Sequence, residues 1–269
     1  MGRLDGKVAF ITGAARGQGR AHAVRLAQDG ADIIASDICG PAATTKYAAS
    51  TPAELEETRR LVEKEGRRIV TGPVDVRDLG GLEALVARGV ADLGHLDIVV
   101  ANAGILTAGL TWELSEEQWM EVVDINLVGV WRTVKATVPT MIAQGTGGAI
   151  VLTSSVAGLK RQAFTSHYTA AKHGVVGLAG TLANELGQYN IRVNTIHPAG
   201  VDTELCKDPD LFTLITEYQD TLGPLFMSTL PFQMMEPEDV AGLVSWLVSD
   251  EAKYLTGAQV PIDFGLLNR

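Results

Sequence analysis

A tyrosine and a lysine in this sequence have the spacing of a proton-transfer pair. Tyr168 and Lys172 are four positions apart, and Ser155 precedes the tyrosine by thirteen. Residues at i and i+4 project from one face of a helix, so the Lys172 ammonium can stabilise a Tyr168 phenolate. Free tyrosine has a pKa near ~10, roughly three units above a neutral operating pH, and a nearby cation can supply part of that shift. The pattern predicts a general acid/base at Tyr168.

A glycine-rich turn near the N-terminus is typical of a dinucleotide site. Residues 12–19 (TGAARGQG) follow an apolar run that we expect to be a strand, and they open a helix. Backbone N–H groups and the positive end of the helix can then face a pyrophosphate. Asp37 lies eighteen positions after Gly19, about where an acidic residue accepts hydrogen bonds from adenosine ribose hydroxyls.

Two charges near this turn act in opposite directions on cofactor choice. Asp37 would repel a 2′-phosphate, whereas Arg16 can reach one from the glycine loop. An acid at a strand end outweighs a flexible exposed cation, so the sequence favours NAD over NADP. Asp75 is a candidate for contact with the adenine. The structural alternatives are a solvated strand end for Asp37 and a loop cap for Asp75.

The elements around these motifs alternate between strands and helices, which predicts one α/β domain over 1–269. A doubly wound, Rossmann-type parallel sheet of about seven strands, with helices on both faces, accounts for the alternation. Capping boxes predict helix starts at Thr51 and Ser115. The first helix is expected at 20–29, and strands are expected at 7–12, 32–36, 68–72, 96–101, 149–153, 191–196 and 259–262.

Composition excludes several other classes of protein. The formal charge of −10 argues against a nucleic-acid surface, and Cys39 and Cys206 are too isolated to suggest a disulfide scaffold. The five histidines lack metal-ligand spacing, so we expect no metal and assign them packing or surface roles. No apolar run reaches about 18 residues and no secretory signal is recognisable, so we expect a cytoplasmic protein without a membrane contact.

Taken together, the motifs resemble the short-chain dehydrogenase/reductase family over nearly the whole chain. The matching features are the turn at 12–19, Asp75-Val76, Asn102-Ala103-Gly104, Asn126, Ser155, Tyr168-x-x-x-Lys172 and Pro198-Ala199-Gly200, where Ala199 replaces the usual glycine.

The resemblance implies a role for each matching residue. Tyr168 would transfer the proton, Ser155 would bind the substrate oxygen, and Lys172 would lower the Tyr168 pKa and hold the nicotinamide ribose. Asn126 would support a water path for the proton. Ser154 competes with Ser155, and the spacing of thirteen to Tyr168 favours Ser155. The implied cofactor contacts are Gly13, Arg16, Gly17, Gln18, Gly19, Asp37, Ile38, Asp75, Val76, Asn102, Ala103, Gly104, Tyr168, Lys172, Pro198, Gly200, Val201 and Thr203, the last at the carboxamide.

A narrower resemblance is to the mycofactocin-associated, carveol dehydrogenase-like subset, because residues 38–50 form an added loop after Asp37. Such connections ordinarily run about 2 to 6 residues. We expect the loop to fold over NAD, through Pro41 and Tyr47, and to slow its release enough for copurification. The subset also implies a separate redox carrier as electron acceptor. The alternative is an ordinary surface insertion.

Two further expectations concern the substrate and the assembly. Segment 202–235 resists assignment and is rich in apolar residues, so we expect a mobile lid over an apolar pocket; a packed helix pair is the alternative. The family commonly forms tetramers through two helices, which predicts a homotetramer. The apolar positions expected on the outer faces of those helices are Val130, Val134, Val138, Val175, Leu178 and Leu182.

The sequence thus predicts an NAD-dependent oxidoreductase that acts on a hydrophobic secondary alcohol or its ketone, with terpenoid, carveol-like alcohols among the candidates. Two alternatives stay open. One is an NADPH-dependent ketoreductase, which only Arg16 supports, and the other is a catalytically idle NAD-binding regulator on the same fold.

Overall fold

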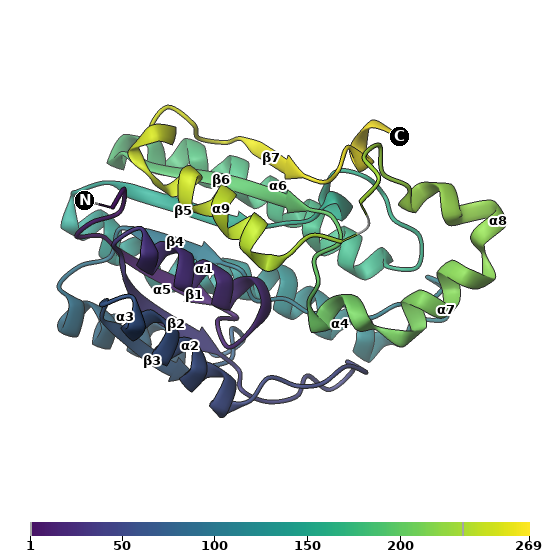
Figure 1. The fold of residues 1–269 in the computed structure, drawn as a ribbon, viewed down its shortest axis with the longest axis horizontal. Coiled ribbons are helices and arrows are strands. Elements are labelled where there is room, and N and C mark those ends of the chain that lie inside the picture. Colours follow the sequence, from purple (N-terminus) through teal and green to yellow (C-terminus); the bar gives the residue numbers. More distant parts are fainter. Residues whose placement is uncertain (1, 233) are drawn as a thin grey trace.

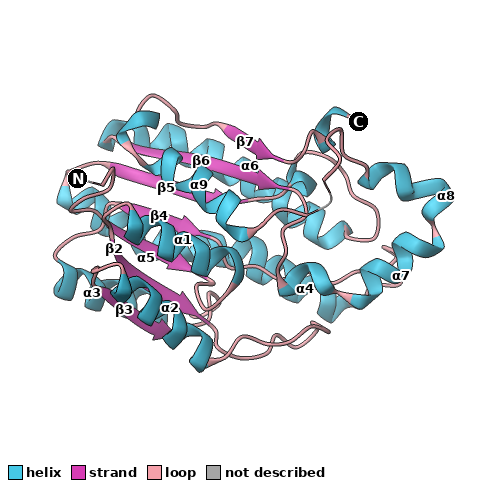
Figure 2. Cartoon of the chain, viewed as in Figure 1, coloured by secondary structure: helices cyan, strands magenta, loops and turns pink. Residues whose placement is uncertain are grey.

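A single parallel sheet forms the centre of the protein in the computed structural model, which describes residues 2–232 and 234–269. Its strand order is β3-β2-β1-β4-β5-β6-β7, and the arrowheads in Figure 2 all reach the same edge. The doubly wound sheet is therefore confirmed. The strands are β1 (Val8–Thr12), β2 (Asp32–Asp37), β3 (Ile69–Pro73), β4 (Ile98–Ala101), β5 (Gly148–Thr153), β6 (Ile191–Pro198) and β7 (Gln259–Ile262). Residue 1 of the expected domain and residue 233 of the expected lid lie outside the described residues.

Helices cover both faces of the sheet (Figure 1). On one face lie α1 (Gly17–Gln28), α2 (Pro52–Lys64) and α9 (Pro237–Val248), which bury Leu26, Val62 and Val244 against the strands. On the other face lie α3 (Leu79–Leu93), α5 (Gly129–Gln144) and α6 (Ser166–Leu186). Burial on both faces explains why the central strands β1, β4 and β5 read as continuous apolar runs.

Two of the helix starts follow from local chemistry and are confirmed. Thr51 caps α2 and Ser115 caps α4 (Glu116–Val123), each through a complete capping box. In α2 the Thr51 side chain accepts the Glu54 N–H, and the Glu54 side chain accepts the Thr51 N–H. Two otherwise unpaired N–H groups are satisfied in this way at each helix start.

The apolar positions expected on the outer faces of α5 and α6 point inward instead. Val130, Val134, Val175 and Leu182 are buried in the core beside the sheet, and Val138 and Leu178 are partly buried against the same core. The expectation was wrong because the apolar stripe of a helix that covers a sheet is the stripe that contacts the sheet. The four buried residues, Val130, Val134, Val175 and Leu182, are therefore not available for a subunit contact.

Two long connections extend beyond the carboxyl edge of the sheet. Residues 38–50, which we call the cover loop, run without helix or strand from β2 toward α4 and α7 (Pro209–Glu217) (Figure 1). Residues 202–235, the lid segment, contain α7, α8 (Gln219–Leu222) and two 3₁₀ turns, Glu204–Lys207 and Gly223–Phe226. No helix in the described ranges combines the length and apolar character needed to cross a bilayer.

The apolar residues of the lid segment differ in their burial. Met235 is buried in the main core and pairs with Val201 in a β-bridge, so this end of the segment belongs to the body of the protein. Leu205 and Leu211 pack beside Tyr168. The more exposed residues of the segment are Phe212, Met227, Leu230, Phe232 and Met234.

Candidate active site

A cavity of about 690 Å³ opens at the carboxyl ends of β1 and β4, where the strand order reverses. Open α/β sheets bind ligands at such a switch point. Thr12 fixes the two strand ends, because its hydroxyl accepts the N–H groups of Asn102 (3.0 Å) and Ala103 (3.1 Å). Gly13 has a φ of +68°, and a Cβ there would lie 2.9 Å from the Ala103 Cα. Only glycine allows this close approach.

Helix α1 presents its positive end to this cavity. The helix begins at Gly17, the Arg16 side chain does not cap it, and its first turn carries no acidic residue. Gly13, Gly17, Gln18 and Gly19 all line the cavity. Because N–H groups at a helix start attract anions, these residues fit a pyrophosphate.

Asp37 lines the same cavity at the end of β2 and is held in one orientation by three hydrogen bonds. Its Oδ2 accepts the Ala15 N–H (3.0 Å), and its Oδ1 accepts the Ser50 hydroxyl (2.6 Å) and the Cys39 N–H (3.0 Å). A carboxylate offers about four acceptor positions, so one remains for a ribose hydroxyl. Ser50 was not recognised from the sequence because it lies thirteen positions away in the cover loop.

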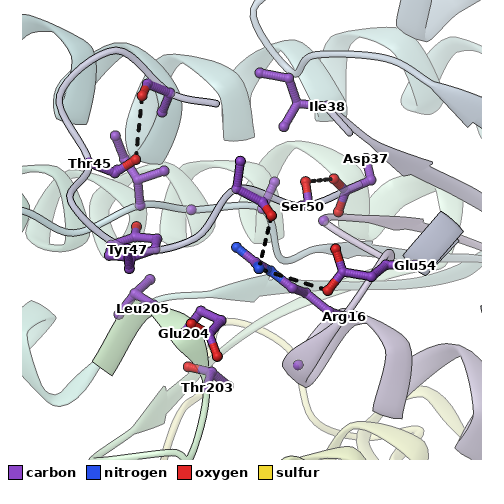
Figure 3. Close-up of a pocket in the computed structure, with 18 of the residues that line it drawn as sticks. Arg16, Asp37, Ile38, Thr45, Tyr47, Ser50, Glu54, Thr203, Glu204 and Leu205 are labelled. Carbon is purple, nitrogen blue, oxygen red and sulfur yellow. Dashed lines mark hydrogen bonds and ion pairs between the residues drawn. The ribbon is translucent and has the colours of Figure 1, made fainter. Parts of the chain in front are cut away.

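Arg16 is not the free cation that the sequence suggested. Its guanidinium donates to the carbonyls of Ala48 and Ala49 and pairs with Glu54 at 3.8 Å (Figure 3). The expectation failed because the cover loop folds back onto the glycine turn. Arg16 therefore ties the loop to the turn, and meeting a 2′-phosphate would break these contacts.

Asp75 lies at the cavity wall and also caps a loop, the two alternatives that the sequence left open. It lines the cavity together with Ile38 and Val76, and its Oδ1 also accepts the Arg77 N–H at 2.9 Å. The Arg77 guanidinium pairs with the same carboxylate at 2.7 Å. Asp75 is therefore a loop cap that remains at the cavity wall.

A smaller cavity of about 70 Å³ contains the four residues expected to be catalytic, Asn126, Ser155, Tyr168 and Lys172. It adjoins the larger one, because Gln18, Asn102, Gly104, Thr203 and Leu205 line both. Pro198 and Val201 line the smaller cavity. Gly200 lines neither of the two, and its carbonyl accepts the Met235 N–H at 3.0 Å.

Ser155, rather than Ser154, faces the tyrosine. The Ser155 hydroxyl shares a cavity with the Tyr168 side chain and accepts the Ala157 N–H at 3.1 Å. The Ser154 hydroxyl donates instead to the backbone carbonyl of Lys172, at 3.0 Å. A substrate oxygen in this cavity would therefore meet the hydroxyls of Ser155 and Tyr168.

Lys172 lies close to Tyr168, but the pKa of the tyrosine differs from the expected direction. The ammonium is 5.4 Å from the centre of the Tyr168 ring and donates to the Thr153 carbonyl at 2.8 Å. Burial raises the pKa of Tyr168, an effect that the Ser155 hydrogen bond opposes. Burial also lowers the pKa of Lys172 to about 8. In the protein alone, desolvation therefore moves the pKa of Tyr168 opposite to the expected direction, and the lowering expected from Lys172 stays a prediction.

Asn126 lies in a π-helical turn, Asp124–Val128, between α4 and α5. Its amide N–H groups donate to the carbonyls of Ile105 and Val122, both at 2.9 Å, and its Oδ1 accepts the Ile105 N–H at 3.1 Å. Both amide protons are therefore used within the protein. A water path past this residue would have to use another group, such as a backbone carbonyl freed by the wider turn.

Two further residues complete the surroundings: His197, which was not expected at the site, and Tyr47, which was expected to cover the nucleotide. His197 is fully buried, and its Nδ1 donates to the Ser155 carbonyl at 2.8 Å. Because a carbonyl only accepts, Nδ1 carries the proton and Nε2 accepts from the Thr195 hydroxyl at 2.8 Å. Tyr47 of the cover loop lines the large cavity. The contact of His197 with Ser155 joins residues 42 positions apart and leaves no local pattern, whereas Tyr47 was expected at the nucleotide from its place in residues 38–50.

Comparison with known proteins reveals extensive similarity. A family model described as short chain dehydrogenase matches residues 7–210. A putative short-chain type dehydrogenase/reductase of Mycolicibacterium smegmatis is 52% identical, covering 98% of each chain. The (-)-trans-carveol dehydrogenase of Rhodococcus erythropolis is 44% identical, covering 98% of this chain and 99% of its own. The crystal structure of carveol dehydrogenase from Mycobacterium avium in complex with NAD is 49% identical, with a TM-score of 0.95 over 100% of both chains.

Proposed function

The chain belongs to the short-chain dehydrogenase family, and on that premise we propose that it is an NAD-dependent oxidoreductase. It moves a hydride between the nicotinamide and a hydrophobic secondary alcohol or its ketone. The observation that carries the proposal is one cavity that brings Ser155, Tyr168 and Lys172 together and adjoins the dinucleotide cavity.

Each group in the smaller cavity has a defined task in this reaction. When bound, NAD supplies the hydride acceptor and, in its oxidised form, a positively charged ring. Ser155 donates a hydrogen bond to the substrate oxygen and orients it. Tyr168 takes the proton of the alcohol, or returns it to the ketone in the reverse direction. Lys172 faces the same space and stabilises the phenolate that forms there.

NAD is proposed over NADP because the two charges near the ribose now act in the same direction. Asp37 would repel a 2′-phosphate, and Arg16 is engaged with the cover loop and Glu54. The NADPH-dependent ketoreductase thereby loses its one supporting feature. The idle regulator is disfavoured by the assembled Asn126, Ser155, Tyr168 and Lys172.

An apolar substrate is proposed because the wall beside Tyr168 is apolar. Leu106, Val122 and Ala157 form one buried cluster with Tyr168, and Ile105, Leu205 and Leu211 pack against it. The carveol dehydrogenase relatives support cyclic terpenoid alcohols as the class. A ring of carbon atoms fits such a pocket better than a small polar alcohol.

Slow NAD exchange is a further part of the proposal. The cover loop borders the large cavity along residues 38–51 and is tied to its rim by Arg16 and Ser50. A loop that must open before NAD can leave lowers mainly the dissociation rate constant of NAD. We propose that NAD copurifies with the protein and passes its electrons to a separate redox carrier of the mycofactocin type. Mass spectrometry of the freshly purified protein tests the first part.

A homotetramer also stays a proposal, supported by the family resemblance. The exposed Trp131 on α5, at 44%, is an apolar residue that a two-fold contact would cover. Light scattering at micromolar concentration tests it, and a monomer alone would contradict it.

The decisive experiment is a reaction series followed by NADH absorbance. Cyclic terpenoid alcohols such as carveol, simple cyclohexanols and small polar alcohols are compared with NAD and with NADP, adding an artificial electron acceptor if bound NAD does not exchange. We expect the highest kcat/KM for cyclic apolar alcohols with NAD. Faster turnover with NADP would favour the ketoreductase, and nucleotide binding without turnover on any alcohol would favour the regulator.

A further inference from the structure

The far end of the cover loop is attached to the substrate side of the protein. The N–H groups of Ala43 and Thr44 each donate to the Glu121 carboxylate of α4 at 2.8 Å, and the Thr44 hydroxyl donates to it at 2.7 Å. Arg77 donates to the same carboxylate at 3.2 Å. Glu121 is only 8% exposed, so these bonds form a shielded anchor for the tip of the loop.

The loop also contacts the lid segment directly. The ammonium of Lys46 pairs with Asp210, near the start of α7, at 2.5 Å. Both side chains are more than one-third exposed, so the pair alone adds little to stability. The ion pair matters because it holds α7, a helix that has no buried residue. A helix without buried residues depends on such peripheral contacts for its order.

Tyr47 makes the third connection, at the junction of the two cavities. Its hydroxyl accepts the Leu106 N–H at 3.2 Å, and Leu106 belongs to the buried cluster that contains Tyr168. Tyr47 lines the large cavity together with Thr203 and Leu205, which also line the catalytic cavity (Figure 3). Burial raises the pKa of Tyr47 to about 12, so the hydroxyl stays neutral.

We propose that Tyr47 is a positioning residue of the substrate pocket, and that through Tyr47 and Lys46 the cover loop holds the lid segment in place. The loop then has two roles: it borders the nucleotide cavity, and it sets one wall of the pocket that selects the alcohol. This inference rests on the proposed function for the identity of the ligands. The attachment of loop to lid concerns only the chain itself.

The physical consequence is coupled opening. Releasing the loop separates Tyr47 from Leu106 and Lys46 from Asp210, and α7 then loses its contacts with the loop. Conversely, an ordered loop restrains α7 and keeps Leu211 against the Tyr168 cluster. Substrate affinity therefore depends on residues of a loop that follows the ribose-binding strand.

Hydrogen–deuterium exchange on the full chain tests the attachment. The double variant Lys46→Met/Tyr47→Phe keeps both side-chain bodies and removes the two polar contacts. We expect exchange in residues 209–217 to rise roughly fivefold, the size expected for loss of about one hydrogen bond. Lys64→Met is the matched control, since none of the described ion pairs includes Lys64. Unchanged exchange in 209–217 would overturn the proposal.

Kinetics with carveol and NAD test the positioning role. For Tyr47→Phe we expect the KM for the alcohol to rise severalfold, with kcat at saturation of both substrates within about twofold of wild type, because the reacting groups are untouched. An unchanged KM, or a loss confined to kcat, would overturn it. Failure of the proposed function would be seen separately. In that case NAD would not slow hydrogen–deuterium exchange of residues 13–19 in any variant. The exchange of residues 209–217, measured without NAD, would still decide whether the loop holds the lid segment.

Discussion

The catalytic residues and the segments that cover them are held in place by different means. Helix α6, which carries Tyr168 and Lys172, has nine buried residues, and Lys172 is only 3% exposed. Helices α7 and α8 of the lid segment have no buried residue, and polar contacts such as Arg16 with Ala49 and Glu121 with Thr44 hold the cover loop. Close packing fixes one arrangement, whereas a few polar contacts can open. We therefore propose that the rigid region carries the chemistry and that the cover loop and lid segment control substrate selection and release.

Replacing the proton-transfer group in the rigid region tests the comparison most severely. We expect Tyr168→Phe to reduce kcat by about 10³-fold, the middle of the range typical for loss of a general acid/base, with NAD affinity nearly unchanged. The ring stays in its cluster, so the thermal midpoint should change little. Stopped-flow turnover and NADH fluorescence titration measure both quantities. Tyr189→Phe, at an exposed position, is the control, and activity of Tyr168→Phe within a few-fold of wild type would refute the assignment.

The second prediction separates activity from stability at Lys172. Burial lowers the pKa of Lys172 to about 8, which means that its charge destabilises the folded protein. Removing the charge with Lys172→Met should abolish turnover and weaken NAD binding. It should also raise the unfolding free energy at pH 7 by about 2 kcal/mol. Removing the buried charge gains roughly 2.5 pKa units at about 1.36 kcal/mol each, and losing the hydrogen bond to the Thr153 carbonyl costs about 1 kcal/mol.

The pH dependence gives the sign of this effect. Between the folded pKa, about 8, and the unfolded pKa, about 10.5, the unfolded wild-type chain binds more protons. Wild-type stability therefore rises with pH through this window, and the advantage of Lys172→Met shrinks. Urea unfolding of both proteins from pH 6 to 10 measures the difference. An equal difference at all pH values would contradict a buried, destabilised ammonium.

The same contrast explains how far the sequence could predict the molecule. The central strands could be located because parallel strands buried on both faces read as apolar runs, and Tyr168 with Lys172 could be paired because helical spacing is local. The contacts of Arg16 with Ala49 and of Glu121 with Thr44 join residues 33 and 77 positions apart and leave no local pattern. The Tyr168 pKa required knowledge of burial. The core positions of α5 and α6 required knowledge of which face meets the sheet.

The choice between NAD and NADP should depend on Asp37, which lies where the packed sheet meets the cover loop. Asp37→Ser removes the charge that opposes a 2′-phosphate, so we expect the NADP-to-NAD ratio of kcat/KM to rise by about tenfold, from loss of like-charge repulsion. Arg16 stays bound to the loop and to Glu54, which limits the gain. Adding Glu54→Gln should therefore increase the ratio further, whereas Glu54→Gln alone should not. A wild-type preference for NADP would contradict the argument.

His197 tests whether the rigid region also depends on polar positioning. Its Nδ1 donates to the Ser155 carbonyl, so His197→Ala should lower kcat about tenfold by loosening one hydrogen bond behind Ser155. His197→Asn should restore kcat to within about threefold, since the side-chain amide can donate to the same carbonyl. His22→Ala, which removes another fully buried histidine, should cost stability without lowering kcat. Equal kcat for the Ala and Asn variants at position 197 would rule out positioning.

The smallest expected effect distinguishes the two regions by their helix caps. Asp78 caps α3, which has five buried residues, and Asp208 caps α7, which has none; each accepts an N–H at 3.0 Å. Losing either cap should cost about 1 kcal/mol locally. For Asp78→Ala the cost falls on the whole fold and should lower Tm by about 2 °C. For Asp208→Ala it falls on the lid, so Tm should change by less than about 1 °C while exchange in residues 209–217 rises roughly fivefold.

Calorimetry and hydrogen–deuterium exchange on both variants measure this difference. An equal fall in Tm would mean that α7 unfolds together with the sheet, and the lid would then have to be regarded as part of the rigid region.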